Sequence, residues 1–157
     1  MRVKGIKEED FCQYKVPSMF VAFPYCSFKC EKDSNQKCCQ NSSLVNSACI
    51  DFPISSIVSA YIANPITSAI VFGGLEPFDS FEDLLNLVEE FRTCTEDTIV
   101  IYTGYYEDEI KGYISALKKF DNIIVKFGRF IPNSDPVFDE VLGVELASSN
   151  QYAKKIS

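Results

Sequence analysis

Four of the seven cysteines in the chain lie close together, in the segment CSFKCEKDSNQKCCQN at 26–41. Three residues separate Cys26 from Cys30, and Cys38 and Cys39 are adjacent. A structural zinc site is usually built from paired Cys-x-x-Cys turns, and this segment contains none. A 4Fe-4S cluster held by three thiolates, with one iron left open for another ligand, fits the spacing better. The segment therefore predicts an iron-sulfur site with Cys26, Cys30 and either Cys38 or Cys39 as ligands.

The composition of the chain narrows the chemistry that these thiols can do. The sequence has no histidine, which excludes Ser-His-Asp and Cys-His catalytic arrangements and His-rich zinc sites. A net charge of -7 argues against a nucleic-acid partner, because binding to phosphates depends on Lys and Arg. Two alternatives remain open: a structural zinc domain built from all four cysteines, and thiols that are buried as small apolar side chains.

The length of 157 residues predicts a single domain spanning 1–157. No segment approaches the roughly 20 apolar residues of a membrane span, and the N-terminal MRVKGIKEEDF carries charges where a secretion signal has an apolar run. We therefore expect a cytoplasmic protein without a membrane partner. Thiols stay reduced in that compartment, which favours metal binding over disulfides in the 26–41 segment. Cys12, Cys49 and Cys94 are isolated, and we expect them to pack in the interior.

The pattern of apolar residues predicts the elements that position the cysteines. Nearly continuous apolar segments predict four buried strands, at 18–25, 68–74, 98–105 and 122–128. Apolar residues at spacings of three and four predict helices at 53–63, 80–92 and 107–120. Ser80, followed three residues later by Asp83, predicts the N-cap of the second helix. The alternation of strands and helices predicts an α/β fold with a parallel sheet.

The distinctive residues follow the ends of these predicted strands. The cysteine segment follows the first strand, GGLEP at 73–77 ends the second, and TGY at 103–105 ends the third. Ligands of parallel α/β sheets collect at the carboxyl ends of the strands. The order therefore predicts one site fed by several strand ends, although Gly and Pro at such positions also serve simply to turn the backbone.

The motifs together resemble radical SAM proteins, and most closely the activating proteins of anaerobic (class III) ribonucleotide reductase and related 4Fe-4S-binding domains. The resemblance depends on the Cys-x3-Cys opening, the later CQN, GGLEP, IVIYTGY, and the tail LASSNQYAKKI at 146–156. It implies an incomplete (βα) barrel with parallel strands that binds a site-differentiated 4Fe-4S cluster. The open iron would be chelated by the amino and carboxylate groups of S-adenosylmethionine (SAM).

The resemblance also implies an activity, which is the reductive cleavage of SAM to methionine and a 5'-deoxyadenosyl radical. In the activating proteins this radical takes a hydrogen atom from a backbone glycine of a large partner enzyme. The implied partners are a glycyl-radical enzyme, such as the large subunit of anaerobic ribonucleotide reductase, and a reductant such as flavodoxin or ferredoxin. The alternative is a non-catalytic 4Fe-4S module for electron transfer or sensing on the same fold.

Cluster ligands can be carried over from the resemblance residue by residue. Cys26 and Cys30 match the first two ligands of the family. Cys39 matches the third, because one residue and then Asn41 follow it, and Cys38 then takes the place of an aromatic residue. Eight residues separate Cys30 from Cys39 where the family has two. Loop closure becomes costlier only slowly with length, by about 0.6 kcal/mol per doubling, so we expect cluster binding to survive the insertion more easily than catalysis.

The SAM-binding residues implied by the resemblance come from the other strand ends. Gly73 and Gly74 would approach the methionine moiety, and Glu76 would meet its ammonium group, although Leu75 is inserted relative to the usual GGEP. Two further groups of contacts are implied nearer the C-terminus. The adenosine pocket would be lined by Thr103 and Tyr105, and a last contact with the cofactor would come from Asn150.

Overall fold

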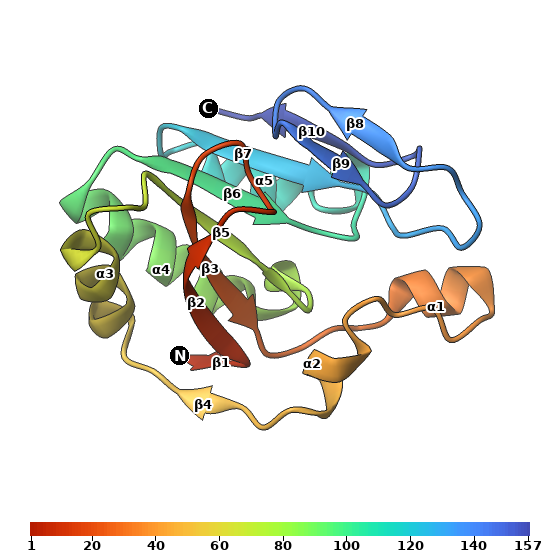
Figure 1. Ribbon diagram of the computed structural model, residues 1–157, viewed down its shortest axis with the longest axis horizontal. Coiled ribbons are helices and arrows are strands. Elements are labelled where there is room, and N and C mark those ends of the chain that lie inside the picture. Colours follow the sequence, from red (N-terminus) through yellow and green to blue (C-terminus); the bar gives the residue numbers. More distant parts are fainter.

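A six-stranded sheet forms the centre of the protein, which the computed structural model describes over residues 1–157 (Figure 1). The strands are hydrogen-bonded in the order β10-β7-β6-β5-β3-β2. The four middle strands are parallel: β3 (Ser18–Phe23), β5 (Ala69–Gly74), β6 (Thr98–Tyr102) and β7 (Ile123–Phe127). They coincide with the four predicted strands, so the predicted parallel sheet is confirmed.

Antiparallel strands that the sequence analysis did not predict flank this parallel core. They are β2 (Gly5–Asp10), which pairs with β3, and β10 (Tyr152–Lys155), which pairs with β7. Two short antiparallel pairs lie outside the sheet: β1 (Arg2–Val3) with β4 (Ile50–Asp51), and β8 (Val137–Asp139) with β9 (Val144–Leu146). The central sheet has two edges, β2 and β10, and the fold is mixed α/β without a complete barrel.

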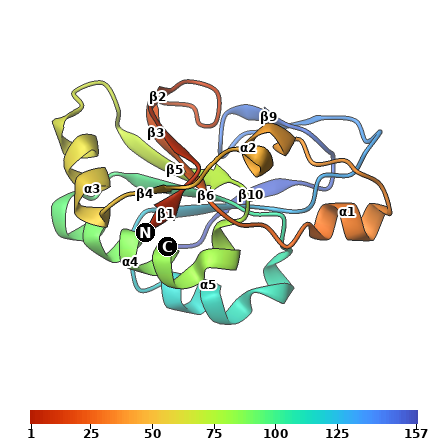
Figure 2. The ribbon, with the colours of Figure 1, turned by 90° about the horizontal axis from the view of Figure 1, so that it is seen from below.

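Three helices cover one face of the sheet (Figures 1 and 2). They are α3 (Ile54–Ala63), α4 (Phe81–Cys94) and α5 (Lys111–Leu117), and a 3-10 turn at Glu107–Glu109 precedes α5. All three helices were predicted. Ser80 is the N-cap residue of α4, as predicted, but its buried hydroxyl makes no capping hydrogen bond. A 3-10 turn at Pro77–Ser80 leads into the helix instead, and the Glu76 carboxylate accepts from its Phe78 N–H.

The apolar side chains of the parallel strands pack on both faces of the sheet. On one face, residues such as Val21, Phe72 and Ile101 pack against α3, α4 and α5. On the other, Val71, Val100 and Ile124 pack against side chains such as Tyr14, Leu142 and Leu146 from the covering loops and β9. Burial on both faces explains why these strands read as continuous apolar runs. No helix in the protein combines the length and apolar character needed to cross a membrane.

Candidate metal centre

The carboxyl ends of the parallel strands and the cysteine segment surround one cavity of about 380 Å³. This volume lies within the range of small-molecule and cofactor sites. The cavity is lined by the four clustered cysteines together with residues from the strand ends, among them Gly74, Glu76, Thr103, Tyr105 and Lys126. The cavity therefore lies at the strand ends where the order of motifs predicted a site, and two of the predicted residues, Gly73 and Asn150, do not line it.

The cysteine segment forms two short helices beyond the strand ends, α1 (Lys29–Ser34) and α2 (Ser42–Asn46), which are orange in Figure 1. Phe28 before α1 and Asn35 after it both have a left-handed backbone, with φ of 54° and 52°. These two residues turn the chain into α1 and out of it. Neither helix has a buried residue, so polar contacts rather than apolar packing hold the segment in place.

All four thiols of the segment are free and partly buried. Burial raises the pKa of Cys26 to about 12 and that of Cys30 to about 11. In the second case the neighbouring Cys38 and Cys39 thiols add to the effect. Without a metal Cys26 and Cys30 are therefore protonated at neutral pH, and binding iron would release their protons.

The donor set fits an iron-sulfur cluster better than a single metal ion. No three Cys, Asp or Glu side chains converge on a position that could hold one ion, whereas four sulfurs of a structural zinc site lie about 2.3 Å from the same ion. Each thiolate of a 4Fe-4S cluster binds a different iron, so its sulfurs need to surround a cavity and not a point. The arrangement of Cys26, Cys30, Cys38 and Cys39 around one cavity meets that requirement.

A hydrogen bond joins the end of the cysteine segment to the glycine turn. The Asn41 side-chain amide donates to the Gly74 carbonyl oxygen at 2.6 Å. Gly74 has φ of +83°, and a Cβ there would lie 2.8 Å from Cβ of Ala22 on the neighbouring strand. The turn therefore requires glycine. Gly73 is buried, and a Cβ on it would lie 3.0 Å from the Phe20 ring, so this glycine allows close packing of the sheet.

Glu76 links the ends of the second and third parallel strands. Its buried carboxylate accepts hydrogen bonds from the Thr103 hydroxyl at 2.8 Å, the Gly104 N–H at 2.8 Å and the Phe78 N–H at 3.2 Å. Burial raises the pKa of Glu76 to about 7, although these three donors favour the ionised form. The carboxylate lies at the cavity wall, and its contact with a ligand ammonium stays a prediction.

Tyr105 fixes the chain beside the first cysteine. Its hydroxyl donates to Oδ1 of Asp79 at 2.6 Å and lies 3.3 Å from the hydroxyl of Ser27, the residue after Cys26. The Ser27 N–H also donates to the Asp79 carboxylate. Asp79 thus positions both Tyr105 and the backbone next to Cys26. The sequence analysis did not identify Asp79, since nothing in its local sequence distinguishes it from other acidic residues at a helix start.

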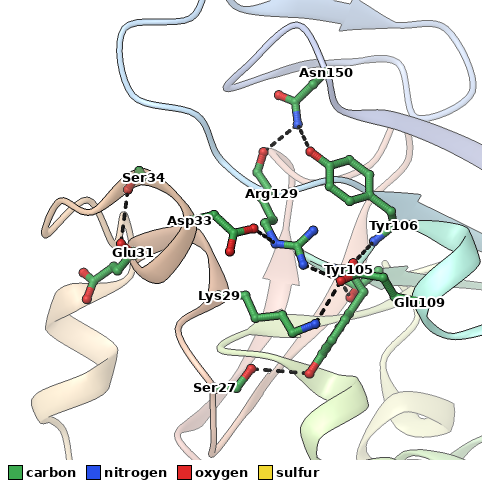
Figure 3. A network of polar contacts seen from close by, with 12 residues as sticks. Ser27, Lys29, Glu31, Asp33, Ser34, Tyr105, Tyr106, Glu109, Arg129 and Asn150 are labelled. Atoms are coloured by element: carbon green, nitrogen blue, oxygen red, sulfur yellow. Dashed lines mark hydrogen bonds and ion pairs between the residues drawn. The ribbon is translucent and has the colours of Figure 1, made fainter.

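Ion pairs join α1 to residues that follow the strands β6 and β7 (Figure 3). Lys29 Nζ lies 2.9 Å from Oε1 of Glu109, and Arg129 Nε lies 2.8 Å from Oδ2 of Asp33. Arg129 also pairs with Glu109, and this hydrogen bond holds the pKa of the Glu109 carboxyl at about 2. Asn150 helps to position Arg129, because its side-chain amide donates to the Arg129 carbonyl oxygen at 2.8 Å.

Lys126 is a buried cation in the cavity wall that the sequence analysis missed. Its ammonium donates to the carbonyl oxygen of Gly128 at 3.0 Å and has no carboxylate within ion-pair distance. Burial lowers the pKa of Lys126 to about 8. The signal was available in the sequence, because a lysine interrupts the apolar strand run IIVKF.

Two of the three isolated cysteines do not pack in the interior, contrary to the expectation. Cys12 and Cys94 are exposed, and only Cys49 is partly covered. Cys12 lies in the loop after the edge strand β2 and contributes to the rim of the cavity, and Cys94 ends α4. Both positions fall at the end of an element, where few neighbours are present to cover a side chain.

Comparison with known proteins supports the iron-sulfur assignment. Searches of the curated proteins and of the solved structures found no match to this chain. The model of a family described as a 4Fe-4S single cluster domain matches residues 16–151, a range that contains the four clustered cysteines and every strand of the parallel core. The chain therefore belongs to the 4Fe-4S single cluster domain family.

Proposed function

We propose that the protein is a radical SAM protein in which Cys26, Cys30 and Cys39 hold the cluster and SAM occupies the rest of the cavity. The observation that carries the proposal is the hydrogen bond between Asn41 and Gly74, which closes the cysteine segment over the glycine turn. The clustered thiols and the strand ends that would bind SAM line the same cavity, which supports the proposal. In this proposal the four parallel strands correspond to the incomplete (βα) barrel of the radical SAM fold.

Cys39 is the third ligand in this proposal. Its backbone N–H donates to the Glu31 carboxylate at 3.1 Å, and it lies two residues before the Asn41 contact. The hydrogen bond to Glu31 and the nearby Asn41 contact fix the position of Cys39. The backbone of Cys38 makes no bond to Glu31, and its thiol contacts the Ser34 hydroxyl at 3.4 Å.

A cluster held by Cys26, Cys30 and Cys39 would, when reduced, supply the electron for the reductive cleavage of SAM. The protein's own residues bind and orient the ligand. Gly74 lets the backbone approach the methionine moiety, because it has no Cβ, and the buried Glu76 carboxylate attracts the ligand ammonium. Thr103 and Tyr105 form the wall on the adenosine side and exclude water. The radical would then pass to a glycyl-radical enzyme, such as anaerobic ribonucleotide reductase, with flavodoxin or ferredoxin as reductant.

Product analysis tests this function. The protein is reconstituted with iron and sulfide under anaerobic conditions, reduced with dithionite and incubated with SAM. We expect release of 5'-deoxyadenosine and methionine in equal amounts from the wild type and from Cys94→Ala, and none from Cys26→Ala. A full cluster that yields no 5'-deoxyadenosine after long incubation would contradict the proposal.

A non-catalytic 4Fe-4S module for electron transfer or sensing is the second candidate. One observation favours it, because the three hydrogen bonds that Glu76 accepts within the protein already occupy the carboxylate expected to meet the SAM ammonium. Calorimetry with SAM separates the two candidates. An electron carrier has no reason to bind SAM, whereas the proposed enzyme binds it to the reconstituted protein.

A further inference from the structure

The cavity contains one more clustered thiol than the proposed function uses. Cys26, Cys30, Cys38 and Cys39 all line it, and three of them complete the proposed ligand set. Cys38 lies beside Cys30, whose pKa it helps to raise, and its Sγ is 3.4 Å from the Ser34 hydroxyl. Its thiol is therefore on the same side of the cavity as a proposed cluster ligand.

We infer that Cys38 is an exchangeable fourth ligand, which binds the open iron when SAM is absent and leaves it when SAM binds. This inference depends on the proposed function for the identity of the competing ligand. A 4Fe-4S cluster has four irons and three fixed thiolates in the proposal, so one coordination site is vacant. A thiol within the same cavity reaches that site at a far higher effective concentration than any thiol in solution.

The turn after α1 explains why Cys38 reaches the cavity. Asn35 has φ of 52° and reverses the chain, so that the residues after it return toward Cys30. The eight residues between Cys30 and Cys39 thus form a loop that brings the Cys38 thiol to the cavity as well. With only two residues between the ligands, the loop would be too short to contain this additional cysteine and its turn.

Cys38 is also less constrained than its neighbour, as an exchangeable ligand must be. The Cys39 N–H is held by the Glu31 carboxylate, whereas the N–H of Cys38 makes no hydrogen bond within the protein. The Cys38 side chain contacts the Ser34 hydroxyl, which can donate to a thiolate, and it lies next to the Cys30 thiol. The difference assigns the fixed role to Cys39 and the mobile one to Cys38.

The exchange balances without any transfer of electrons. When Cys38 binds iron, its thiol releases a proton to solvent and an iron-sulfur bond forms. When the amino and carboxylate groups of SAM take the iron, that bond breaks and the Cys38 sulfur takes up a proton from water. SAM must displace a bound thiolate. Its apparent affinity is therefore its affinity for the open iron multiplied by the fraction of protein in which that iron is open.

The test compares reconstituted wild type with Cys38→Ala, with Cys39→Ala and with Cys94→Ala as the matched control. Three quantities are measured: the iron and sulfide content, the electron paramagnetic resonance spectrum of the dithionite-reduced protein with and without SAM, and the SAM dissociation constant by calorimetry. Cys38 is partly exposed, so its truncation leaves no sealed hole in a core. Circular dichroism of each variant confirms folding.

We expect Cys38→Ala to keep the iron content of the wild type, to differ from it in the spectrum without SAM, and to match it once SAM is bound. Its SAM affinity should be about tenfold higher, as expected when a competitor is removed. Cys39→Ala should hold its cluster through Cys26, Cys30 and Cys38 without SAM and should lose it when SAM displaces Cys38, and Cys94→Ala should behave as wild type. Loss of the cluster in Cys38→Ala, or an unchanged spectrum and affinity, would overturn the inference. Should neither protein bind SAM, the proposed function fails, and the spectra without SAM still decide whether Cys38 is a ligand.

Discussion

The side-chain amide of Asn41 donates to the backbone carbonyl of Gly74 at 2.6 Å, across 33 positions of sequence. Asn41 ends the segment that contains the four clustered cysteines, and Gly74 ends the strand β5. Because α1 and α2 bury no side chain, this contact is one of the few that determine where the cysteines lie relative to the sheet.

Replacing Asn41 with Ala should weaken SAM binding to the reconstituted protein about fivefold. This corresponds to the roughly 1 kcal/mol that one hydrogen bond contributes. Calorimetry with SAM measures the change. Asn46→Ala is the matched control, because the amide of Asn46 donates only to the Ser42 carbonyl within α2. Equal affinities of the two variants would show that the Asn41 contact does not position the site.

Gly74→Ala should destabilise the fold by about 1–3 kcal/mol in urea unfolding. The added Cβ meets a left-handed φ of +83° and lies 2.8 Å from the Cβ of Ala22. Gly112→Ala provides the comparison, since Gly112 lies in the helix α5 and a Cβ added there would have no atom within 4 Å. For Gly112→Ala we expect the free energy of unfolding to rise by up to about 1 kcal/mol. A Gly74 variant as stable as the wild type would contradict the strained turn.

Glu109→Gln should lower stability at neutral pH by about 1 kcal/mol, because it removes the ion pairs to Lys29 and Arg129. The folded pKa of Glu109 lies below its ordinary value of 4.5, at about 2, as Arg129 donates to the carboxylate. The stabilisation is therefore present above pH 4.5 and is lost as the pH falls toward 2.

Urea unfolding at pH 7, 4.5 and 3 checks the Glu109 prediction. The difference between the wild type and Glu109→Gln should shrink at the lowest pH. Glu9→Gln is the control, since the side chain of Glu9 makes no ion pair or hydrogen bond. A difference that stays constant with pH would show that the Glu109 carboxylate does not contribute through its charge.

Lys126→Met should stabilise the protein at pH 7 by about 1 kcal/mol, because it removes a buried charge that has no carboxylate partner. Burial lowers the folded pKa of Lys126 from 10.5 to about 8. Between these values the unfolded chain binds more protons than the folded one, so the stability of the wild type rises with pH relative to the variant. The advantage of Lys126→Met should therefore decrease from pH 8 to pH 10.5.

The Lys126 prediction is measured by urea unfolding under reducing conditions at both ends of that pH range. Lys119→Met, at an exposed position on the surface, controls for the loss of a lysine. An advantage that grows with pH, or that Lys119→Met reproduces, would contradict the burial of an unpaired ammonium.

The parallel core was predictable because its strands are covered on both faces and therefore show uninterrupted apolar runs, as in AIVFGG of β5. The edge strands β2 and β10 were not, since their exposed residues, such as Lys7 and Lys154, give no apolar pattern. The iron-sulfur character of the domain, predicted from the cysteine segment, is confirmed by the family match.

The details of the site depend on contacts between residues distant in sequence, which local patterns do not encode. The hydrogen bond from the Tyr105 hydroxyl to Asp79 and the ion pair between Arg129 and Asp33 are examples. The tail residue Asn150 is an example of a predicted contact that the local sequence did not determine. It was expected to contact the cofactor, but it does not line the cavity, and its amide donates to the Arg129 carbonyl oxygen and to the Tyr106 hydroxyl. Its contact with SAM stays a prediction.

The most direct test of the account is whether SAM binds an iron of the cluster. SAM labelled with ¹⁵N in its amino group and ¹⁷O in its carboxylate is added to the dithionite-reduced, reconstituted protein, and electron-nuclear double resonance is recorded. The account predicts hyperfine coupling of both labels to the spin of the cluster, which is absent with unlabelled SAM. A reduced cluster and bound SAM without coupling to either label would contradict it.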